Sequence, residues 1–297
     1  MVVAALLLPS NGAIARDLSA EQVLKPHIQA DWWQIAGDPD LGELTSSKQQ
    51  PVDFAVWQAT DGKWQLWSCV RGTKEPGNTR LLYAWEGEKL TDPNWKPKGI
   101  TLRADPKMGE HPGGLQAPFV FRDGRRFVMF YGSWDHICSA ISADGKYFQR
   151  HLNSEDKTPL FGETSGNTRD PMLIRIGNLW HCYYTAHPEN KGTDYCRTSS
   201  NLLDWSPAHV VAKGGQAGEG PWSAECPFVV ELEPGKFYLF RTQRYGANAQ
   251  TSVYFSHDPL DFGLNNDKDH FVCTLPVAAP EIIHQISNGS LPHFCRA

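Results

Sequence analysis

The sequence contains no run of lysine or arginine residues. Its 28 Lys and Arg residues and 33 Asp and Glu residues give a net charge of −5, which argues against nucleic acid or an anionic membrane as a partner. The apolar run at residues 2–8 is too short to span a bilayer. With 40% hydrophobic and 21% charged residues, the 297-residue chain has the composition of a globular protein.

The sequence also contains no Cys-x-x-Cys pair. Seven cysteines are present, an odd number, and most of them fall within apolar runs that are typical of strands. We therefore expect buried thiols, with one disulfide left as an alternative, and no zinc site. The sequence predicts no metal and no cofactor.

The N-terminus has features of an export signal. The apolar run at 2–8 is followed by Ala13, Ile14 and Ala15, which resemble a small-residue cleavage site, although the basic opening segment is missing. We interpret residues 1–15 as a signal peptide remnant, which predicts a secreted or periplasmic protein. A disordered tail is the alternative. Residues 16–50 form a lead-in segment with a predicted short helix at 19–24.

One phrase recurs about every 55 residues. It begins at Asp53, Ala117, Asp170, Glu225 and Ala279, with steps of 64, 53, 55 and 54 residues. Each complete copy has a short apolar run and then a turn that contains glycine. Repeats of this length and pattern are typical of β-propellers, so the sequence predicts an all-β, five-bladed β-propeller over residues 51–297, in a single domain.

The fifth copy is short. Only residues 285–297 follow its apolar run, and this tail does not have the pattern of a closing strand. Either the lead-in supplies strands to the last blade, or the sequence is truncated or frame-shifted near its end. The pattern favours the second explanation, and an incomplete blade would expose sheet edges.

Acidic residues open three of the copies. Because equivalent residues of successive blades surround one axis, we expect Asp53, Asp170 and Glu225 to converge at one end of the channel. Cleavage of a glycosidic bond needs a protonated carboxyl and a second carboxylate. Glu225 has apolar neighbours that raise a carboxyl pKa, so it is the candidate acid. Asp53 is the candidate nucleophile or base, and Asp170 the residue that orients substrate hydroxyls.

Four further residues are candidates for binding substrate. Arg169 precedes Asp170, and Trp222 lies close enough to Glu225 to form the floor of a sugar subsite. His111 and Gln116 lie before or within the inner strand of the second copy. For these two residues a role in stabilising a turn is an equal alternative, and for Trp222 the alternative is core packing.

The motifs carry a resemblance to a known group of enzymes. Arg169-Asp170-Pro171 and Glu225-Cys226-Pro227 resemble two motifs of glycoside hydrolase family 32, and Asp53 lies where that family and family 43 place a catalytic Asp. The resemblance to this invertase and arabinanase-like superfamily covers nearly the whole chain. It implies a glycoside hydrolase that acts on furanosides or xylosides of plant or microbial glycans. Residues 52–54 depart from the family 32 motif, and the β-sandwich typical of that family is absent.

Other functions stay open at this point. A carbohydrate-binding propeller without catalysis is the main alternative, because one fold serves many functions. A transglycosylase or a phosphorylase is a second, although a phosphorylase needs more cations near the acids. The expected partner is an oligosaccharide or polysaccharide. The sequence leaves the sugar, the linkage, the stereochemical outcome and the oligomeric state undetermined.

Overall fold

The computed structural model describes residues 2–7, 23–28, 32–163, 167–215, 218–264, 267–283 and 293–296. These residues form strands and short 3-10 helices, and the structure contains no α-helix in this part of the chain. None of the described helices is long and apolar enough to cross a membrane. The short helices are η1 (Gly42–Leu44), η2 (Pro106–Met108), η3 (Pro188–Asn190), η5 (Gly246–Asn248) and η6 (Asp267–Asp269).

Four antiparallel sheets are built from consecutive strands, and we call them blades I to IV. Blade I contains β4 (Gln50–Gln58), β5 (Trp64–Arg71), β6 (Leu81–Gly87) and β7 (Lys96–Leu102). Blade II contains β8 (Leu115–Asp123), β9 (Arg126–Ser133), β10 (His136–Ser142) and β11 (Gln149–His151), with β12 (Pro159–Phe161) also paired to β10. Blade III contains β13 (Arg169–Ile176), β14 (Leu179–Ala186), β15 (Thr193–Ser199) and β16 (His209–Lys213). Blade IV contains β17 (Glu225–Glu233), β18 (Lys236–Arg244), β19 (Gln250–Ser256) and β20 (Phe271–Leu275).

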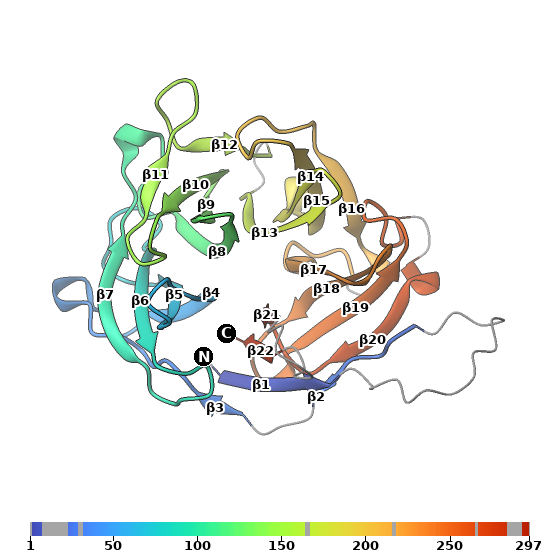
Figure 1. Cartoon of the computed structure of the whole chain (residues 1–297), viewed down its shortest axis with the longest axis horizontal. Coiled ribbons are helices and arrows are strands. Elements are labelled where there is room, and N and C mark those ends of the chain that lie inside the picture. Colours follow the sequence, from blue (N-terminus) through green and yellow to red (C-terminus); the bar gives the residue numbers. More distant parts are fainter. Residues whose placement is uncertain are drawn as a thin grey trace.

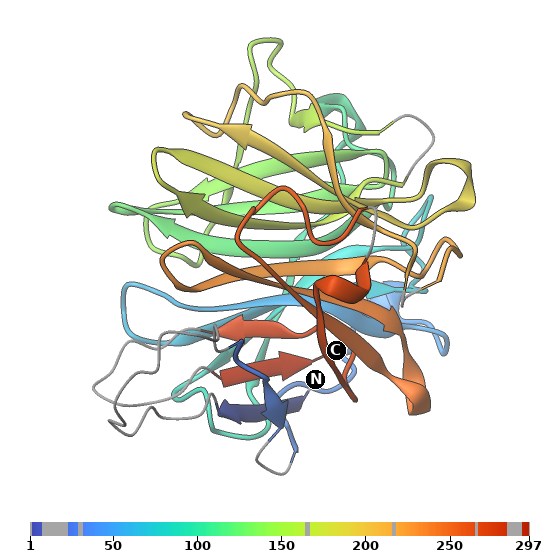
Figure 2. The same ribbon diagram turned by 90° about the vertical axis from the view of Figure 1, so that its right-hand side faces the viewer.

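The two ends of the chain share another sheet, which we call the terminal sheet. It contains β1 (Val2–Leu7), β2 (His27–Ile28), β3 (Trp33–Gln34), β21 (Glu281–Ile283) and β22 (His293–Arg296). Strand β1 pairs with β2, β3 and β22, and β22 pairs with β21. Figure 1 shows the sheets arranged in a ring, with the first strand of each blade nearest the centre, and Figure 2 shows the same ring from the side.

The all-β propeller predicted from the repeat is therefore confirmed, and the expected count of five equivalent blades is met only in part. Four blades are regular, whereas the terminal sheet combines strands from both ends of the chain. The expectation that the C-terminal tail forms no strand is wrong for residues 293–296. Its partner β1 comes from the other end of the chain, which no local pattern can reveal. Residues 19–22 of the predicted helix lie outside the described residues, and 23–24 are not helical.

Residues 2–7 fall within the predicted signal segment, and in the structure they pair as a strand. Export of the protein stays a prediction. The lead-in helps to build the terminal sheet through β2 and β3, so it is continuous with the propeller.

The direction of the hairpins defines two rims of the ring. In blades I to IV the second strand runs antiparallel to the first, so its end returns to the rim where the first strand begins. We call this the site rim. Turns at the opposite rim contain Gly62, Gly124, Gly177 and Gly235, whose φ angles lie between 59° and 81°. Glycine adopts this left-handed conformation without a steric penalty, which explains the turns seen in the sequence.

Neighbouring blades pack through apolar and aromatic side chains. Between blades I and II, for example, Trp57, Trp67 and Phe148 make edge contacts with ring centroids 5.2 to 5.9 Å apart. Of the described cysteines, five are buried and Cys226 is half-buried, and all six are free thiols. The buried thiols expected from the sequence are thus part of this packing.

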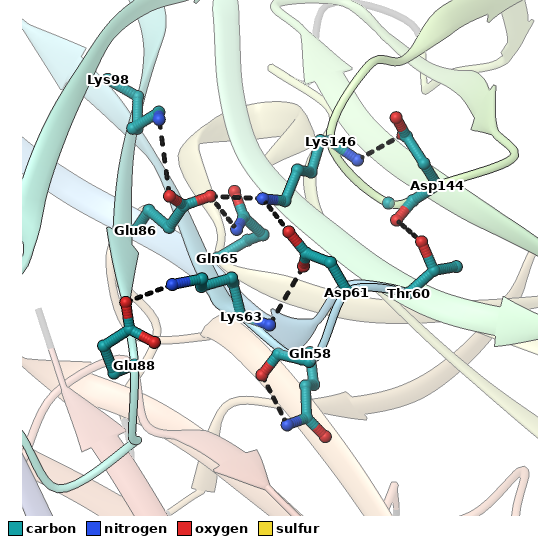
Figure 3. A network of polar contacts seen from close by, with 12 residues as sticks. Gln58, Thr60, Asp61, Lys63, Gln65, Glu86, Glu88, Lys98, Asp144 and Lys146 are labelled. Carbon is teal, nitrogen blue, oxygen red and sulfur yellow. Dashed lines mark hydrogen bonds and ion pairs between the residues drawn. The ribbon is translucent and has the colours of Figure 1, made fainter.

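A polar network also joins blades I and II near the opposite rim (Figure 3). Lys146, which follows β10, lies 2.5 Å from Asp61 and 2.6 Å from Glu86 on blade I. The backbone N–H of Thr60 donates to the carbonyl of Asp144. The hydrogen bond from Lys146 lowers the pKa of Glu86 to about 2. The network therefore holds the two blades together most strongly when Glu86 is ionised.

We predict that Lys146→Met lowers the free energy of unfolding by about 0.5–1 kcal/mol at pH 7, because it removes a cation shared by two carboxylates. The folded-state pKa of Glu86 is depressed from its ordinary value of 4.5 to about 2. Its stabilisation is thus present above pH 4.5 and is lost as the pH falls toward 2. Urea denaturation at several pH values measures both effects.

Lys98→Met is the matched control, because Lys98 lies 3.4 Å from the same Glu86 carboxylate but on the same blade. We expect a smaller effect from this variant. An equal loss of stability in the two variants would show that the link between the blades has no special importance.

Candidate functional site

Each inner strand has a residue in the left-handed region of φ within or just before its first half. The φ angles are positive at one position of every repeat, namely Asp53 (37°), Ala117 (45°), Asp170 (57°), Cys226 (49°) and Ala279 (44°). In blades I to IV the strand register also shifts at this position, which is the mark of a β-bulge. Bulges next to functional sites change the direction of a side chain. The repeated backbone distortion thus marks the site rim in every repeat.

This geometry corrects the phase of the fourth repeat. The sequence aligned Glu225 with Asp170, whereas the left-handed residue of blade IV is Cys226. Glu225 instead matches Arg169 of blade III, since each opens its strand opposite a threonine of the second strand. The two aspartates are therefore equivalent to each other, and the glutamate approaches the centre from the preceding position.

A pocket lies at the centre of the ring, bordered by all the inner strands. It contains about 380 Å³ of empty space, part of which is open to solvent. Asp53, Asp170 and Cys226 line it, as does Glu281 of the terminal sheet. Glu225 does not line this pocket directly, but it immediately precedes Cys226.

The guanidinium of Arg169 connects the acids of blades III and IV. Its Nη2 atom makes an ion pair with Oε1 of Glu225, and its Nε lies 3.7 Å from Oδ2 of Asp170. The backbone N–H of Cys226 donates to the same Asp170 oxygen at 3.0 Å. All three charged side chains are less than 9% exposed. The cation thus holds two carboxylates close together in a site with little water.

Asp53 completes the group from blade I. The Sγ atom of Cys226 lies 3.9 Å from Oδ1 of Asp53 and 3.6 Å from Oδ2 of Asp170, so both carboxyl groups border one thiol. Burial, followed by the negative charges of Asp170 and Glu225, raises the pKa of Asp53 to about 7. The convergence of the three acids expected from the repeat is therefore present in the structure.

Glu225 is subject to opposing effects. Burial raises its pKa, and the charge of Arg169 acts in the other direction. The net result is a raised pKa, as its apolar neighbours in the sequence suggested. Since Asp53 and Glu225 influence each other, the protons are shared by the set of acids rather than held by one residue alone.

A second buried ion pair joins blades III and IV behind this group. Nε of Arg241 lies 3.9 Å from Oδ2 of Asp194, and both side chains are at most 1% exposed. Thr185 donates to Asp194, and Thr185 is also the strand partner of Arg169. Burial raises the pKa of Asp194 to about 7 even though Arg241 opposes the shift. This pair fixes the strands that carry Arg169 and Glu225.

Aromatic side chains surround the acids on the site rim. Trp222 is 57% exposed, and the Arg169 guanidinium lies 5.6 Å from its ring centroid. The ring of His187 makes an edge contact with Trp222 at 5.3 Å. The hydroxyl of Tyr245 lies 3.5 Å from Sγ of Cys226. An exposed indole of this kind can stack on the apolar face of a sugar.

Tyr245 and His187 are not among the predicted site residues, because the rim that they occupy depends on the direction of the strands. Both residues follow the second strand of their blade. The antiparallel hairpin returns them to the site rim, and this regular alternation of direction is the signal that could have identified them.

None of the four predicted binding residues, namely Arg169, Trp222, Gln116 and His111, lines the pocket. Gln116 is 2% exposed and donates a hydrogen bond to Asn167. His111 lies on the site rim with its ring 6.2 Å from that of Trp134, and its Nδ1 lies 3.2 Å from the Asn78 amide. The contacts of both residues are with neighbouring segments, which agrees with the turn-stabilising alternative.

The chemistry available to this site is that of carboxyl groups. Among the described residues, no group of three or more His, Cys, Asp and Glu side chains is arranged to hold a metal ion. The site does combine two carboxyls of raised pKa with a third carboxylate and a guanidinium. Such a set can donate a proton, accept a proton and bind hydroxyl groups.

Comparisons with solved structures identify the fold. A thermostable family 43 glycoside hydrolase is 19% identical, with a TM-score of 0.56 over 72% of this chain and 71% of that chain. An endo-arabinase from Bacteroides thetaiotaomicron is 11% identical, with a TM-score of 0.60 over 87% and 98%. A family 32 β-fructofuranosidase from Bombyx mori, solved with sucrose, is 17% identical, with a TM-score of 0.56 over 80% and 52%.

These structures confirm, at the level of the fold, the resemblance to families 32 and 43 that the sequence motifs carried. The sequence matches no family model, and no curated protein matches it significantly.

We predict that Asp53→Asn stabilises the protein at pH 8 by on the order of 2 kcal/mol, because a buried carboxylate near two others no longer has to ionise. The pKa of Asp53 is raised from 3.8 to about 7, so the wild type loses stability as the pH rises through this range. The difference should therefore vanish below about pH 4. Thermal denaturation at pH 4 and pH 8 measures it.

Asp123→Asn is the control, because Asp123 lies at a hairpin turn on the opposite rim and pairs with Arg126. Its effect should stay within about 0.5 kcal/mol. A wild type and Asp53→Asn variant of equal stability at pH 8 would contradict the close approach of the three acids.

Proposed function

We propose that this protein is a glycoside hydrolase that cleaves O-glycosidic bonds of glycans containing furanosides or xylosides. The observation that carries the proposal is the close approach of Asp53, Asp170 and Glu225 at the centre of the ring, where the first two line the pocket and Arg169 pairs with the last two. A binding site for neutral sugars gains nothing from three mutually repelling carboxyls. Hydrolysis, in contrast, uses carboxyls in different protonation states.

The proposed roles follow from the environment of each acid. Glu225, with a raised pKa, protonates the leaving oxygen. Asp53 attacks the sugar or activates a water molecule, and a pKa of about 7 suits a base that works near neutral pH. Asp170 binds sugar hydroxyls and stabilises positive charge as it develops on the sugar ring.

The aromatic rim supports a sugar substrate. The exposed ring of Trp222 lies beside the Arg169 guanidinium, so a sugar stacked on the indole would be within reach of the acids. The related structures support the same class of substrate, since they include an endo-arabinase and a β-fructofuranosidase bound to sucrose. These names make arabinofuranosides, xylosides and fructofuranosides the first substrates to test.

We further propose that the terminal sheet serves as the fifth blade. Its Ala279 has the left-handed φ found at the start of the other inner strands, and residues 279–281 line the same pocket.

We predict that Glu225→Gln reduces kcat/KM on nitrophenyl arabinofuranosides or xylosides by about 100-fold to 10,000-fold, the range typical of a lost general acid. Asp53→Asn should cause a loss of similar size. Asp123→Asn, which changes an acid on the opposite rim, should leave the rate unchanged. Wild-type activity in Glu225→Gln would exclude it as the acid, and the absence of any hydrolysis would favour a carbohydrate-binding propeller.

The leaving group distinguishes an acid from a structural residue. A dinitrophenolate leaves without protonation, so Glu225→Gln should lose much less activity on a dinitrophenyl glycoside than on a mononitrophenyl glycoside. Asp53→Asn should lose activity on both. If Glu225→Gln were equally impaired on the two substrates, its carboxyl would not deliver the proton.

The pH profile follows from the same assignment. The kcat/KM of the free enzyme should fall as the pH drops below about 7, because Asp53 becomes protonated there. A rate that continues to rise below pH 5 would contradict the role of Asp53 as the base.

A further inference from the structure

The pocket contains a fourth carboxyl that the proposed reaction does not use. Glu281 lies on β21 and lines the pocket together with Asp53 and Asp170. Strand β21 packs beside β4, the strand that carries Asp53. Glu281 is half-buried, and no described residue makes an ion pair or side-chain hydrogen bond with its carboxyl.

The position of Glu281 in the repeat makes it unusual. It stands two residues after the left-handed Ala279. The corresponding residues of the other repeats are all apolar and buried, namely Ala55, Phe119, Met172 and Phe228. In blades I to IV, apolar side chains therefore pack at this position. Only in the terminal sheet does a carboxyl replace them, and there it faces the pocket.

The environment of Glu281 favours its protonated form. Burial raises its pKa well above the ordinary value of 4.5, and no cation among the described residues opposes this effect. A neutral carboxyl has an O–H donor as well as acceptor oxygens. Sugar hydroxyls can accept from the first and donate to the second, which would satisfy the group once a ligand is bound.

We propose that Glu281 is a substrate-binding residue, whose carboxyl holds a hydroxyl group of the sugar in the pocket. This inference rests on the proposed function for its choice of ligand. Its role is distinct from that of the catalytic acids, because it works with its proton in place throughout the reaction. It determines which sugars fit, since a ring without a hydroxyl at that point would leave the carboxyl unsatisfied.

Two substitutions test the inference. Glu281→Leu places an aliphatic side chain at a position that is apolar in the other blades, so it should raise the midpoint of thermal unfolding. It should also raise KM, and the dissociation constant of the sugar, about tenfold, because a hydrogen bond to the sugar is lost. A residue that only supports the fold would not show greater stability together with weaker binding.

Glu281→Gln retains a donor and an acceptor without charge, so it should recover most of the lost affinity and remain within about threefold of wild type. The wild-type KM should rise at alkaline pH as Glu281 ionises, and the Gln variant should not share this change. Glu225→Gln differs from Glu281→Gln, because it removes the proton that the proposed reaction needs.

Binding can be measured without turnover, by calorimetry with L-arabinose, D-xylose and D-fructose. Suppose that no glycoside is hydrolysed, but that one of these sugars binds to the wild type and to Glu281→Gln, and only weakly to Glu281→Leu. The inference about Glu281 then holds, and the hydrolase proposal fails. If glycosides are hydrolysed and Glu281→Leu has the KM of the wild type, the inference is overturned while the hydrolase proposal stands. Wild-type protein that neither binds these sugars nor hydrolyses their glycosides would overturn both.

Discussion

The site depends on the ion pairs of one buried guanidinium. Arg169 contacts Glu225 on the next blade and lies beside Asp170 on its own strand. Without this cation, two buried carboxylates would repel each other in a region of low dielectric constant. Burial, followed by the charges of these two groups, raises the pKa of the neighbouring Asp53 to about 7. The cation thus holds the acids of two blades close together beside Asp53.

The propeller brings these residues together through a feature of the backbone repeated in each unit. Near the start of every inner strand lies a residue of positive φ, and none of the five is glycine. Such conformations cost energy for ordinary residues, and they commonly occur at functional sites where the surrounding structure maintains them. Here the hairpin partners and the buried pair of Asp194 and Arg241 supply that support. Ion pairs between blades therefore serve both the fold and the site.

Much of this arrangement is predictable from the sequence, because repeat length determines the architecture and the repeat phase places Asp53 and Asp170 at equivalent positions. The one-residue offset of Glu225 is not predictable, since it depends on where the bulge forms in β17. The pairing of β22 with β1 joins segments nearly 300 residues apart, which no local pattern reveals. Tyr245 and Glu281 could both have been identified from the sequence. The alternating direction of the hairpins places Tyr245 on the site rim, and alignment of the repeats shows that Glu281 is the one acid at a position that is otherwise apolar.

The most direct test of the account is the pKa of the Asp53 carboxyl, measured by NMR titration in the wild type and in Asp170→Asn and Glu225→Gln. Proximity of the three acids predicts a value near 7 in the wild type and a lower value in each variant, because each substitution removes a negative charge that raises it. A wild-type value near 4 that neither substitution changes would show that the carboxyls do not meet, and the proposed site would have to be abandoned.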